Sequence, residues 1–217
     1  MQFAVLSHPS RLQDEIKLIK WMFDQGLMEF HLRKPNWSKL DIERFIHKIP
    51  VKYRERVFTH THPRLTGKYE LGGTHFSGLH KPTIDDMRAL DRKGMTVTKV
   101  EELPTVDYRI DYLLFGPVFN SIQQHTYHCR IDDQEMLGVL ETHGAGRTIL
   151  ALGGIDAHNI ERARELGFDG VVAFAALWEV HLASGIDQTK EKFLELQAIC
   201  RELAHDTAAP VSDAMER

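Results

Sequence analysis

The chain has 217 residues, 42% of them hydrophobic, which is enough for one large core and predicts a single domain. Its formal net charge of -4 excludes the basic surface that a nucleic-acid-binding protein needs to neutralise phosphates. The apolar N-terminal run is too short for a signal peptide, no stretch approaches a membrane span, and Cys129 and Cys200 lack the spacing of a disulfide framework or zinc site. We therefore expect a cytoplasmic protein with no nucleic-acid and no membrane partner.

Short apolar runs alternate with segments of helical periodicity along the chain. The runs predict strands at residues 2–6, 27–32, 56–59, 72–76, 95–100, 112–115, 149–151 and 171–173. The periodic segments predict helices at residues 12–23, 38–49, 65–69, 83–90, 132–140, 156–167 and 186–203. Residues 120–130 are polar and rich in histidine, with neither period, so we expect a loop there.

The stretch from residue 148 to residue 177 predicts a βαβ unit around a pair of glycines. Its two unbroken apolar runs suit strands that are covered on both faces, and such strands are usually parallel. Asp156 is predicted to cap the helix between them, and Gly167 to end it in a left-handed conformation. Gly153 and Gly154, directly after a strand, suit either a phosphate-binding loop or a tight turn, and the glycines alone do not separate the two.

Eight predicted strands alternating with helices favour an α/β fold, a (β/α)8 TIM barrel that residues 1–206 form as one domain. A doubly wound sheet has the same local signals, but eight units without a shift in composition favour a closed barrel. Residues 207–217 have little to bury and are predicted to be a disordered tail. In such a barrel the carboxyl ends of the strands form one mouth, where we expect polar groups from distant parts of the chain to meet.

Four motifs, in this order and spacing, carry a resemblance to a known family. They are FHLRK at residues 30–34, THFSG at 74–78, DYLLFGPVF at 111–119 and LALGGI at 150–155. Together they resemble the thiamine phosphate synthase and TenI-type thiazole tautomerase family, over roughly residues 2–203. The resemblance implies a barrel that handles thiazole phosphate. A synthase of this family couples it to a pyrimidine diphosphate with magnesium and releases diphosphate, whereas a tautomerase isomerises the thiazole.

The resemblance also implies two binding regions at the mouth. A phosphate cradle would consist of the backbone amides of residues that follow the last two strands: Gly153, Gly154, Phe174 and Ala175. The diphosphate and the rest of the substrate would meet side chains from the other strand ends: Arg33, Lys34, His75, Thr96 and Ser121. The implied partners are small-molecule phosphates. The sequence does not decide whether the chain forms a homodimer.

The chain departs from both catalytic patterns of the family. The Asn-Asp pair expected after the third strand aligns with Thr59 and His60, and the acid expected just after Gly78 is absent. The two carboxylates expected to hold Mg²⁺ are therefore missing. The synthase lysine expected after residue 119 is missing as well, and the tautomerase histidine aligns with Pro117. Three functions stay open: a synthase-like transferase, which we expect first, a thiazole tautomerase, and a binding protein that has lost catalysis.

Histidines at the strand ends are the candidate acid–base groups. His31, His60 and His75 all end strands, and histidine titrates near neutrality. Each alone is more often a buried, hydrogen-bonded residue, but three at one mouth favour a function. We predict His31, Arg33 and His60 as catalytic residues, with His31 ranked before His60 for proton transfer. A metal site formed by His60, His62 and His75 is the alternative, ranked below proton transfer.

Overall fold

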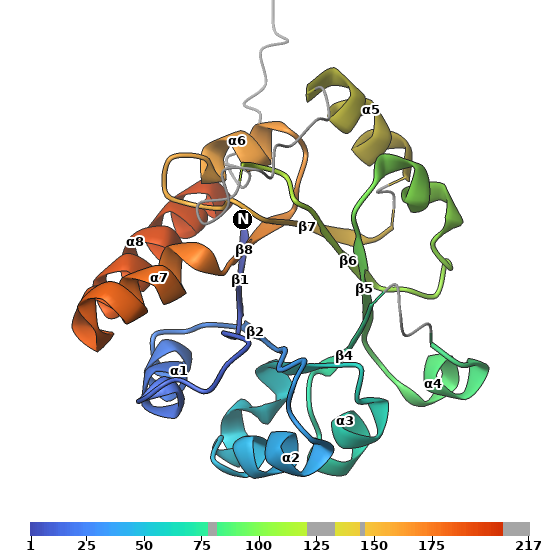
Figure 1. The fold of residues 1–217 in the computed structure, drawn as a ribbon. Helices are drawn as coiled ribbons and strands as arrows, with labels where there is room; N and C mark the ends of the chain where they lie inside the picture. Colours follow the sequence, from blue (N-terminus) through green and yellow to red (C-terminus); the bar gives the residue numbers. More distant parts are fainter. Residues whose placement is uncertain (78–81, 121–132, 144–145, 206–217) are drawn as a thin grey trace, which may run out of the picture.

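The computed structural model describes residues 1–77, 82–120, 133–143 and 146–205. Its parallel strands close into a barrel, in which each strand pairs with the next along the chain and the last pairs with the first (Figure 1). The strands are β1 (Gln2–Leu6), β2 (Glu29–Leu32), β3 (Val57–His60), β4 (Gly73–Phe76), β5 (Lys93–Val97), β6 (Tyr112–Phe115), β7 (Thr148–Leu152) and β8 (Gly170–Ala173). The predicted (β/α)8 barrel is confirmed.

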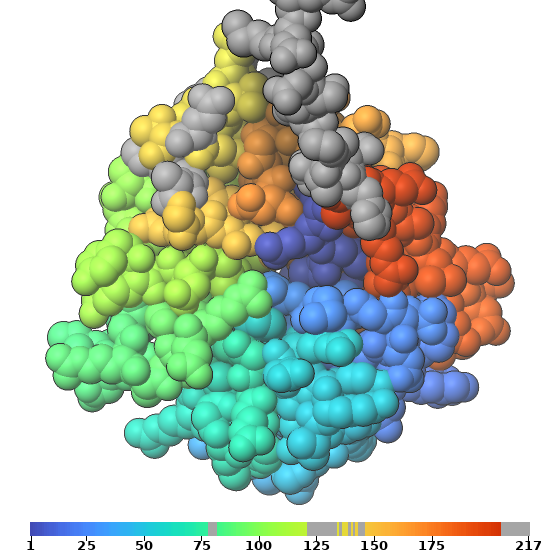
Figure 2. Space-filling model, turned by 180° about the vertical axis from the view of Figure 1, so that it is seen from behind, coloured from blue at the N-terminus to red at the C-terminus, as the bar shows by residue number. Residues whose placement is uncertain are grey.

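Helices lie around the outside of the barrel (Figure 1). They are α1 (Glu15–Asp24), α2 (Lys39–His47), η1 (Val51–Arg56), α3 (Pro63–Tyr69), α4 (Ile84–Ala89), η2 (Val100–Thr105), α5 (Asp133–His143), α6 (Ile160–Glu165), α7 (Ala175–Ser184) and α8 (Ile186–His205), where η marks a 3-10 helix. Figure 2 shows the opposite side, where cyan, green, orange and red segments lie around the dark-blue N-terminal segment. Among the described residues, no helix combines the length and the apolar character needed to cross a lipid bilayer.

The fifth strand is shorter than the sequence predicts. β5 ends at Val97, and Val100 begins η2 instead of extending the strand. The carboxylate of Glu102 accepts hydrogen bonds from the backbone amides of Thr98 (2.9 Å) and Lys99 (3.3 Å), which turns the chain away from the sheet. The side chain of Val100 still packs against the core, which accounts for its apolar character.

The helix after β7 begins later than predicted. α6 starts at Ile160, so the prediction that Asp156 caps it is wrong. The Asp156 carboxylate accepts a hydrogen bond from the amide of Ala157 (2.7 Å) and pairs with the ammonium of Lys192 on α8 (2.5 Å). It therefore ties the turn before α6 to a neighbouring helix. Gly167 follows α6 with a φ of +92°, the left-handed conformation that the sequence predicts.

The helix α7 lacks the apolar stripe of a surface helix, so periodicity does not predict it. Its Trp178 is fully buried, and the indole Nε1 donates a hydrogen bond to the carbonyl oxygen of Leu6 at the end of β1 (2.7 Å). The backbone amides of Leu177 and Trp178 both bond to the carbonyl oxygen of Phe174. α7 therefore begins directly at the carboxyl end of β8.

The inside of the barrel contains an apolar cluster and, in contact with it, several buried polar side chains. Because side chains alternate along a strand, every second residue points inward. The inner cluster of buried apolar residues consists of Ala4, Leu6, Phe58, Tyr112, Leu114, Leu150 and Val172. Beside it, Glu29 and His31 on β2 and His75 on β4 are buried polar residues. This polar part of the interior positions the candidate site.

Candidate functional site

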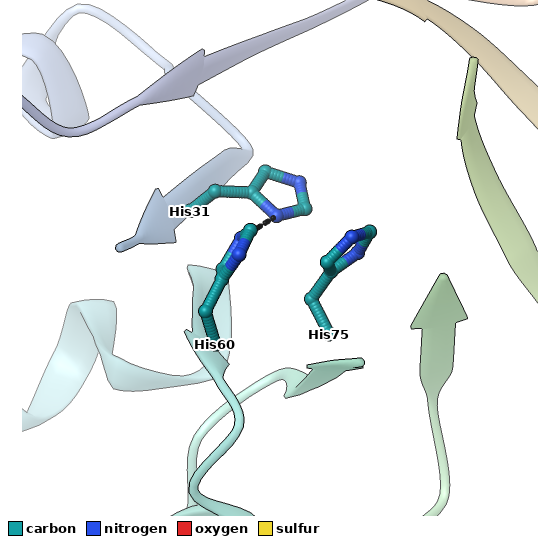
Figure 3. Close-up of side chains that lie close together, drawn as sticks. All are labelled: His31, His60 and His75. Carbon is teal, nitrogen blue, oxygen red and sulfur yellow. Dashed lines mark hydrogen bonds between the residues drawn. The ribbon is translucent and has the colours of Figure 1, made fainter. Parts of the chain in front are cut away.

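Three histidine side chains from neighbouring strands meet inside the barrel (Figure 3). His31 lies on β2, His60 on β3 and His75 on β4, and the strand register places His60 beside His75. Each offers a ring nitrogen, and these three atoms all lie within 4.8 Å of one another. His31 and His75 are buried, and His60 is half-buried. We call these residues the histidine cluster. The sequence predicts that they lie together, and the structure brings them together.

The cluster is held by direct contacts between its rings. His31 Nδ1 and His60 Nε2 are 3.2 Å apart and share a hydrogen bond, drawn as the dashed line in Figure 3. The rings of His60 and His75 stack with their centroids 4.4 Å apart. The ring of His31 also stacks on Phe58, one of the inner apolar residues, at 5.5 Å. His31 is thus packed deeper in the barrel than a residue that simply lines the mouth.

Glu29 fixes the orientation of His31. It stands two residues earlier on β2, so both side chains point to the same face of the strand. His31 Nε2 donates to Glu29 Oε1 (2.8 Å), while the guanidinium of Arg92 lies 3.0 Å from Glu29 Oε2. Burial acts to raise the pKa of Glu29, but the hydrogen bond from His31 and the charge of Arg92 hold that pKa below its ordinary value.

The ionised Glu29 requires a hydrogen on one ring nitrogen of His31. A carboxylate only accepts, so His31 Nε2 must be the donor. His31 Nδ1 and His60 Nε2 share the next hydrogen bond, in which one ring nitrogen donates and the other accepts. The order Arg92, Glu29, His31, His60 forms one hydrogen-bonded polar chain, which we call the polar column.

The outer two histidines of the cluster are kept neutral. Burial lowers the pKa of His60 well below its ordinary value, and the neighbouring His75, His31 and Arg33 lower it further. Burial likewise lowers the pKa of His75, with His31 and Arg33 as the next causes. Both rings are therefore uncharged at neutral pH, and each has a lone pair that can accept a proton or bind a metal.

Thr96 and Tyr112 hold His75 on its other side. His75 Nε2 lies 2.7 Å from Thr96 Oγ1, and His75 Nδ1 lies 3.3 Å from the hydroxyl of Tyr112. Burial, followed by the charge of Glu29, raises the pKa of Tyr112 well above its ordinary value, so this hydroxyl keeps its proton. Thr96, which the sequence places in the substrate region, thus contacts the histidine cluster directly.

Arg33 is fixed by its backbone and presents its side chain to solvent. Its amide donates to Ser7 Oγ (2.8 Å), and Ser7 Oγ donates to its carbonyl oxygen (3.0 Å). Within the described part of the chain, its guanidinium makes no hydrogen bond or ion pair. Its positive charge lowers the pKa of both His60 and His75, so this cation lies close enough to act on the cluster.

Lys34 does not join Arg33. Because it follows Arg33 by one residue, it points away from the barrel interior. Its buried ammonium donates to both carboxylate oxygens of Glu15 on α1 (2.6 and 2.7 Å) and to the carbonyl oxygen of Ser10 (2.9 Å). The expectation that Lys34 meets substrate at the mouth is therefore corrected: its charge is already paired under α1.

The glycine pair after β7 meets a structural demand. Gly153 and Gly154 have φ of +94° and +68°, and an added Cβ would lie 2.8 Å from Pro117 Cα and 2.4 Å from the carbonyl oxygen of Asn120, respectively. The tight turn predicted as one alternative is thus present. The phosphate-binding alternative stays open. The turn follows β7 and the start of α7 follows β8, and these two strands pair, so both lie at the same end of the barrel.

Four backbone amides lie at this end of the barrel. Those of Gly153, Gly154, Phe174 and Ala175 donate no backbone hydrogen bond within the residues that the structure describes. Phe174 immediately precedes α7 and Ala175 is its first residue, where helix amides lack partners and the helix dipole is positive. Free amides of this kind suit an anion.

Two predicted residues fall outside this arrangement. Ser121 lies outside the described residues. His62 immediately precedes α3 and is not among the described residues whose nitrogens converge; His31 takes its place beside His60 and His75. Glu29, Arg92 and Tyr112 were not predicted. The two-residue period of β2 contains the signal for Glu29, whereas Arg92 and Tyr112 reach the cluster only because the barrel closes.

Comparison with known proteins finds similarity to proteins named thiamine-phosphate synthase. No family model matches it. It is 30% identical over 137 residues to the thiamine-phosphate synthase of Lysinibacillus sphaericus strain C3-41, covering 57% of this chain and 60% of that protein. It is 26% identical over 153 residues to the thiamine-phosphate synthase of Helicobacter pylori strain Shi470, covering 68% of this chain and 64% of that protein. The matches span less than two thirds of either relative.

The solved structures extend the likeness over the whole barrel. Thiamine phosphate pyrophosphorylase from Bacteroides thetaiotaomicron has a TM-score of 0.77 and 26% identity, covering 93% of this chain and 98% of that chain. The chain resembles the thiamine phosphate synthases. The pyrophosphorylase from Pyrococcus furiosus, with a TM-score of 0.74 and 17% identity over 93% of this chain and 96% of that one, shares the fold.

Likeness to thiamine phosphate synthases implies magnesium, and the described residues do not fit it. Mg²⁺ prefers oxygen ligands, commonly carboxylates, in octahedral geometry. The histidine cluster offers nitrogen atoms. In the described part of the site, the Glu29 carboxylate is already bound by His31 and Arg92, and the Asp156 carboxylate pairs with Lys192. The two missing carboxylates noted in the sequence are not replaced there.

Proposed function

We propose that this chain is a thiamine phosphate synthase-like transferase, which couples thiazole phosphate to a pyrimidine diphosphate and releases diphosphate. One observation carries the proposal: the structural likeness to a thiamine phosphate pyrophosphorylase at 26% identity over 93% of the chain. The two curated relatives support it over part of their lengths. A cytoplasmic location stays a prediction, and a homodimer stays open.

In this proposal the two ends of the mouth hold the two substrates. The free amides of Gly153, Gly154, Phe174 and Ala175 would bind the phosphate of the thiazole, aided by the positive end of α7. Coupling breaks the bond between the pyrimidine and its diphosphate, so negative charge grows on the diphosphate. Arg33 would neutralise it, because a guanidinium binds phosphate oxygens in pairs and strengthens as their charge grows.

The test is a coupling assay that follows thiamine phosphate from thiazole phosphate and pyrimidine diphosphate. We expect weak turnover, and loss of about 10- to 100-fold in Arg33→Ala, the effect of one charge-assisted hydrogen bond. Arg88→Ala is the matched control, because Arg88 is also exposed but lies on α4 away from the cluster. Brisk coupling that tolerates Arg33→Ala would show that Arg33 does not contact the diphosphate.

A thiazole tautomerase is the second candidate, supported by the polar column. Glu29 and His31 hold the His60 ring in place through its Nε2, and the neutral His60 ring can accept a proton. His60 is half-buried rather than fully buried. Isomerisation of thiazole phosphate by the parent protein but not by His60→Asn, without coupling, would favour this candidate. Binding of thiazole phosphate with neither reaction would favour a binding protein.

A further inference from the structure

The spacing within the histidine cluster matches that of metal ligands. Metal–nitrogen bonds of 2.0–2.1 Å in tetrahedral geometry place two ligand nitrogens about 3.3 Å apart. His31 Nδ1 and His60 Nε2 are 3.2 Å apart. The nitrogen of His75 lies within 4.8 Å of both, so a modest movement of one ring would bring the third ligand into range. Three strands of a closed barrel carry these residues and limit how far they can separate.

A second observation is the partner of His31. Histidines that bind metals usually donate their other ring nitrogen to a carboxylate, which fixes the ring and strengthens it as a ligand. His31 Nε2 donates to the buried Glu29, and this turns Nδ1 toward His60. Arg92 in turn holds Glu29 at 3.0 Å.

We propose that His31, His60 and His75 bind one divalent transition-metal ion of the zinc and cobalt class. Three imidazole nitrogens suit such an ion and do not suit Mg²⁺. Three protein ligands leave a fourth position open, as in catalytic metal sites. The site stands on its own geometry. If the coupling reaction also holds, this ion would supply part of the positive charge that Mg²⁺ supplies in the family. The carboxylates that would hold Mg²⁺ are missing from this chain.

The test uses the full chain without a polyhistidine tag, stripped with a chelator and loaded with Co²⁺. Bound metal is measured by elemental analysis after excess is removed, and its geometry by visible absorption. We expect about one equivalent with the strong visible bands of a low-coordinate cobalt–imidazole site. Mg²⁺ in large excess should not displace it. Binding should also raise the melting temperature of the parent protein, because the ion binds only the folded state.

Variants distinguish this site from adventitious binding. His60→Gln and His75→Gln should each weaken cobalt binding at least tenfold and remove both the visible bands and the rise in melting temperature. His62→Gln and His158→Gln are matched controls that should bind as the parent does, since neither belongs to the cluster. Circular dichroism of every variant checks that it is folded.

Two results would overturn the proposal. One is a folded parent protein that shows no saturable cobalt binding. The other is cobalt binding that survives in folded His60→Gln and His75→Gln, or that is lost in His62→Gln. Because these measurements contain no substrate, failure of the coupling reaction would leave them unaffected, and loss of the metal site would not by itself refute coupling.

Discussion

The role of a residue in this chain depends on which face of its strand its side chain occupies. Arg33 and Lys34 are neighbours with the same charge, yet one is an exposed cation beside the cluster and the other is buried against Glu15. Alternation along β2 explains the difference. For the Glu15–Lys34 pair, burial raises the pKa of Glu15 and lowers the pKa of Lys34, so desolvation outweighs their attraction at both groups. The pair therefore acts in stability rather than in binding.

Replacing one partner of this ion pair should destabilise the protein strongly. Glu15→Gln leaves the Lys34 ammonium buried without a counter-charge, and we expect the free energy of unfolding to fall by about 3–5 kcal/mol. Urea denaturation measures it. The matched control is the double variant Glu15→Leu with Lys34→Met, which removes both charges and should recover most of the loss. A single variant as stable as the parent would show that Lys34 is not confined under α1.

The residue-level features could be predicted only in part. Arg33 and the three histidines are visible because they follow apolar runs, where strand ends are expected. The error at Lys34 arose from treating two adjacent cations as one feature, although adjacent residues on a strand face opposite sides. Glu29 follows the two-residue period from His31 and could have been found. Arg92 could not, because it comes from the segment before β5 and reaches β2 only across the barrel.

At the scale of elements, the strands were predictable and several helix boundaries were not. Strands buried on both faces are unbroken apolar runs, and this signal is local. α7 is apolar on nearly all sides, because Trp178 and its neighbours are packed under α8 and against β1, so it shows no stripe. At Asp156 the capping signal was present, but the ion pair with Lys192 on α8 takes the carboxylate. Tertiary contacts decided both cases.

The start of α7 offers a clean test of anion binding. Substitution of Gly153 or Gly154 would confuse strain with loss of binding, because both glycines have positive φ and touch the loop after β6. Ala175 is partly exposed at the first position of the helix. Ala175→Glu should keep or slightly raise stability, by about 0.3–1 kcal/mol, because an acid favours this end of the helix dipole. The same charge should weaken thiazole phosphate binding at least tenfold by repelling the anion.

Ala175→Gln is the matched control for that prediction, since it has nearly the same size and no charge. Isothermal titration with thiazole phosphate and with inorganic phosphate measures the affinities, and thermal unfolding measures the stability. Equal affinity for thiazole phosphate in the Glu and Gln variants would contradict the phosphate cradle at α7. Equal loss in both would indicate a steric effect instead.

At the scale of the whole molecule, closure of the barrel creates the histidine cluster. His31, His60 and His75 are separated by 29 and 15 positions in the sequence, and they become neighbours because consecutive strands pair in register. Arg92 and Tyr112 join them from further around the barrel. Local patterns predicted eight strands, but not which inward side chains share one level of the barrel. Closure also brings the N-terminus to α8: the amino group of Met1 donates to the carbonyl oxygen of Cys200 (2.9 Å).

The reactivity of the Cys200 thiol measures whether α8 stays packed against the barrel. Burial raises the pKa of its thiol to about 12, and the side chain is almost fully covered. In a Cys129→Ser variant at pH 8, we expect the native protein to react with a thiol reagent at least about 1,000-fold more slowly than the protein unfolded in guanidinium, because both thiolate and access are lacking. The absorbance of the released chromophore follows the reaction. A native thiol that reacts as fast as free cysteine would mean that α8 opens readily.

The polar column has a consequence for how this protein can change. Barrel interiors are usually filled by layers of branched apolar side chains, whereas here Arg92, Glu29, His31 and His60 occupy part of that space. Buried charged pairs rarely stabilise a fold more than well-packed apolar residues of the same volume. If these residues serve the chemistry proposed above, stability and activity make opposite demands on the same few positions of this barrel.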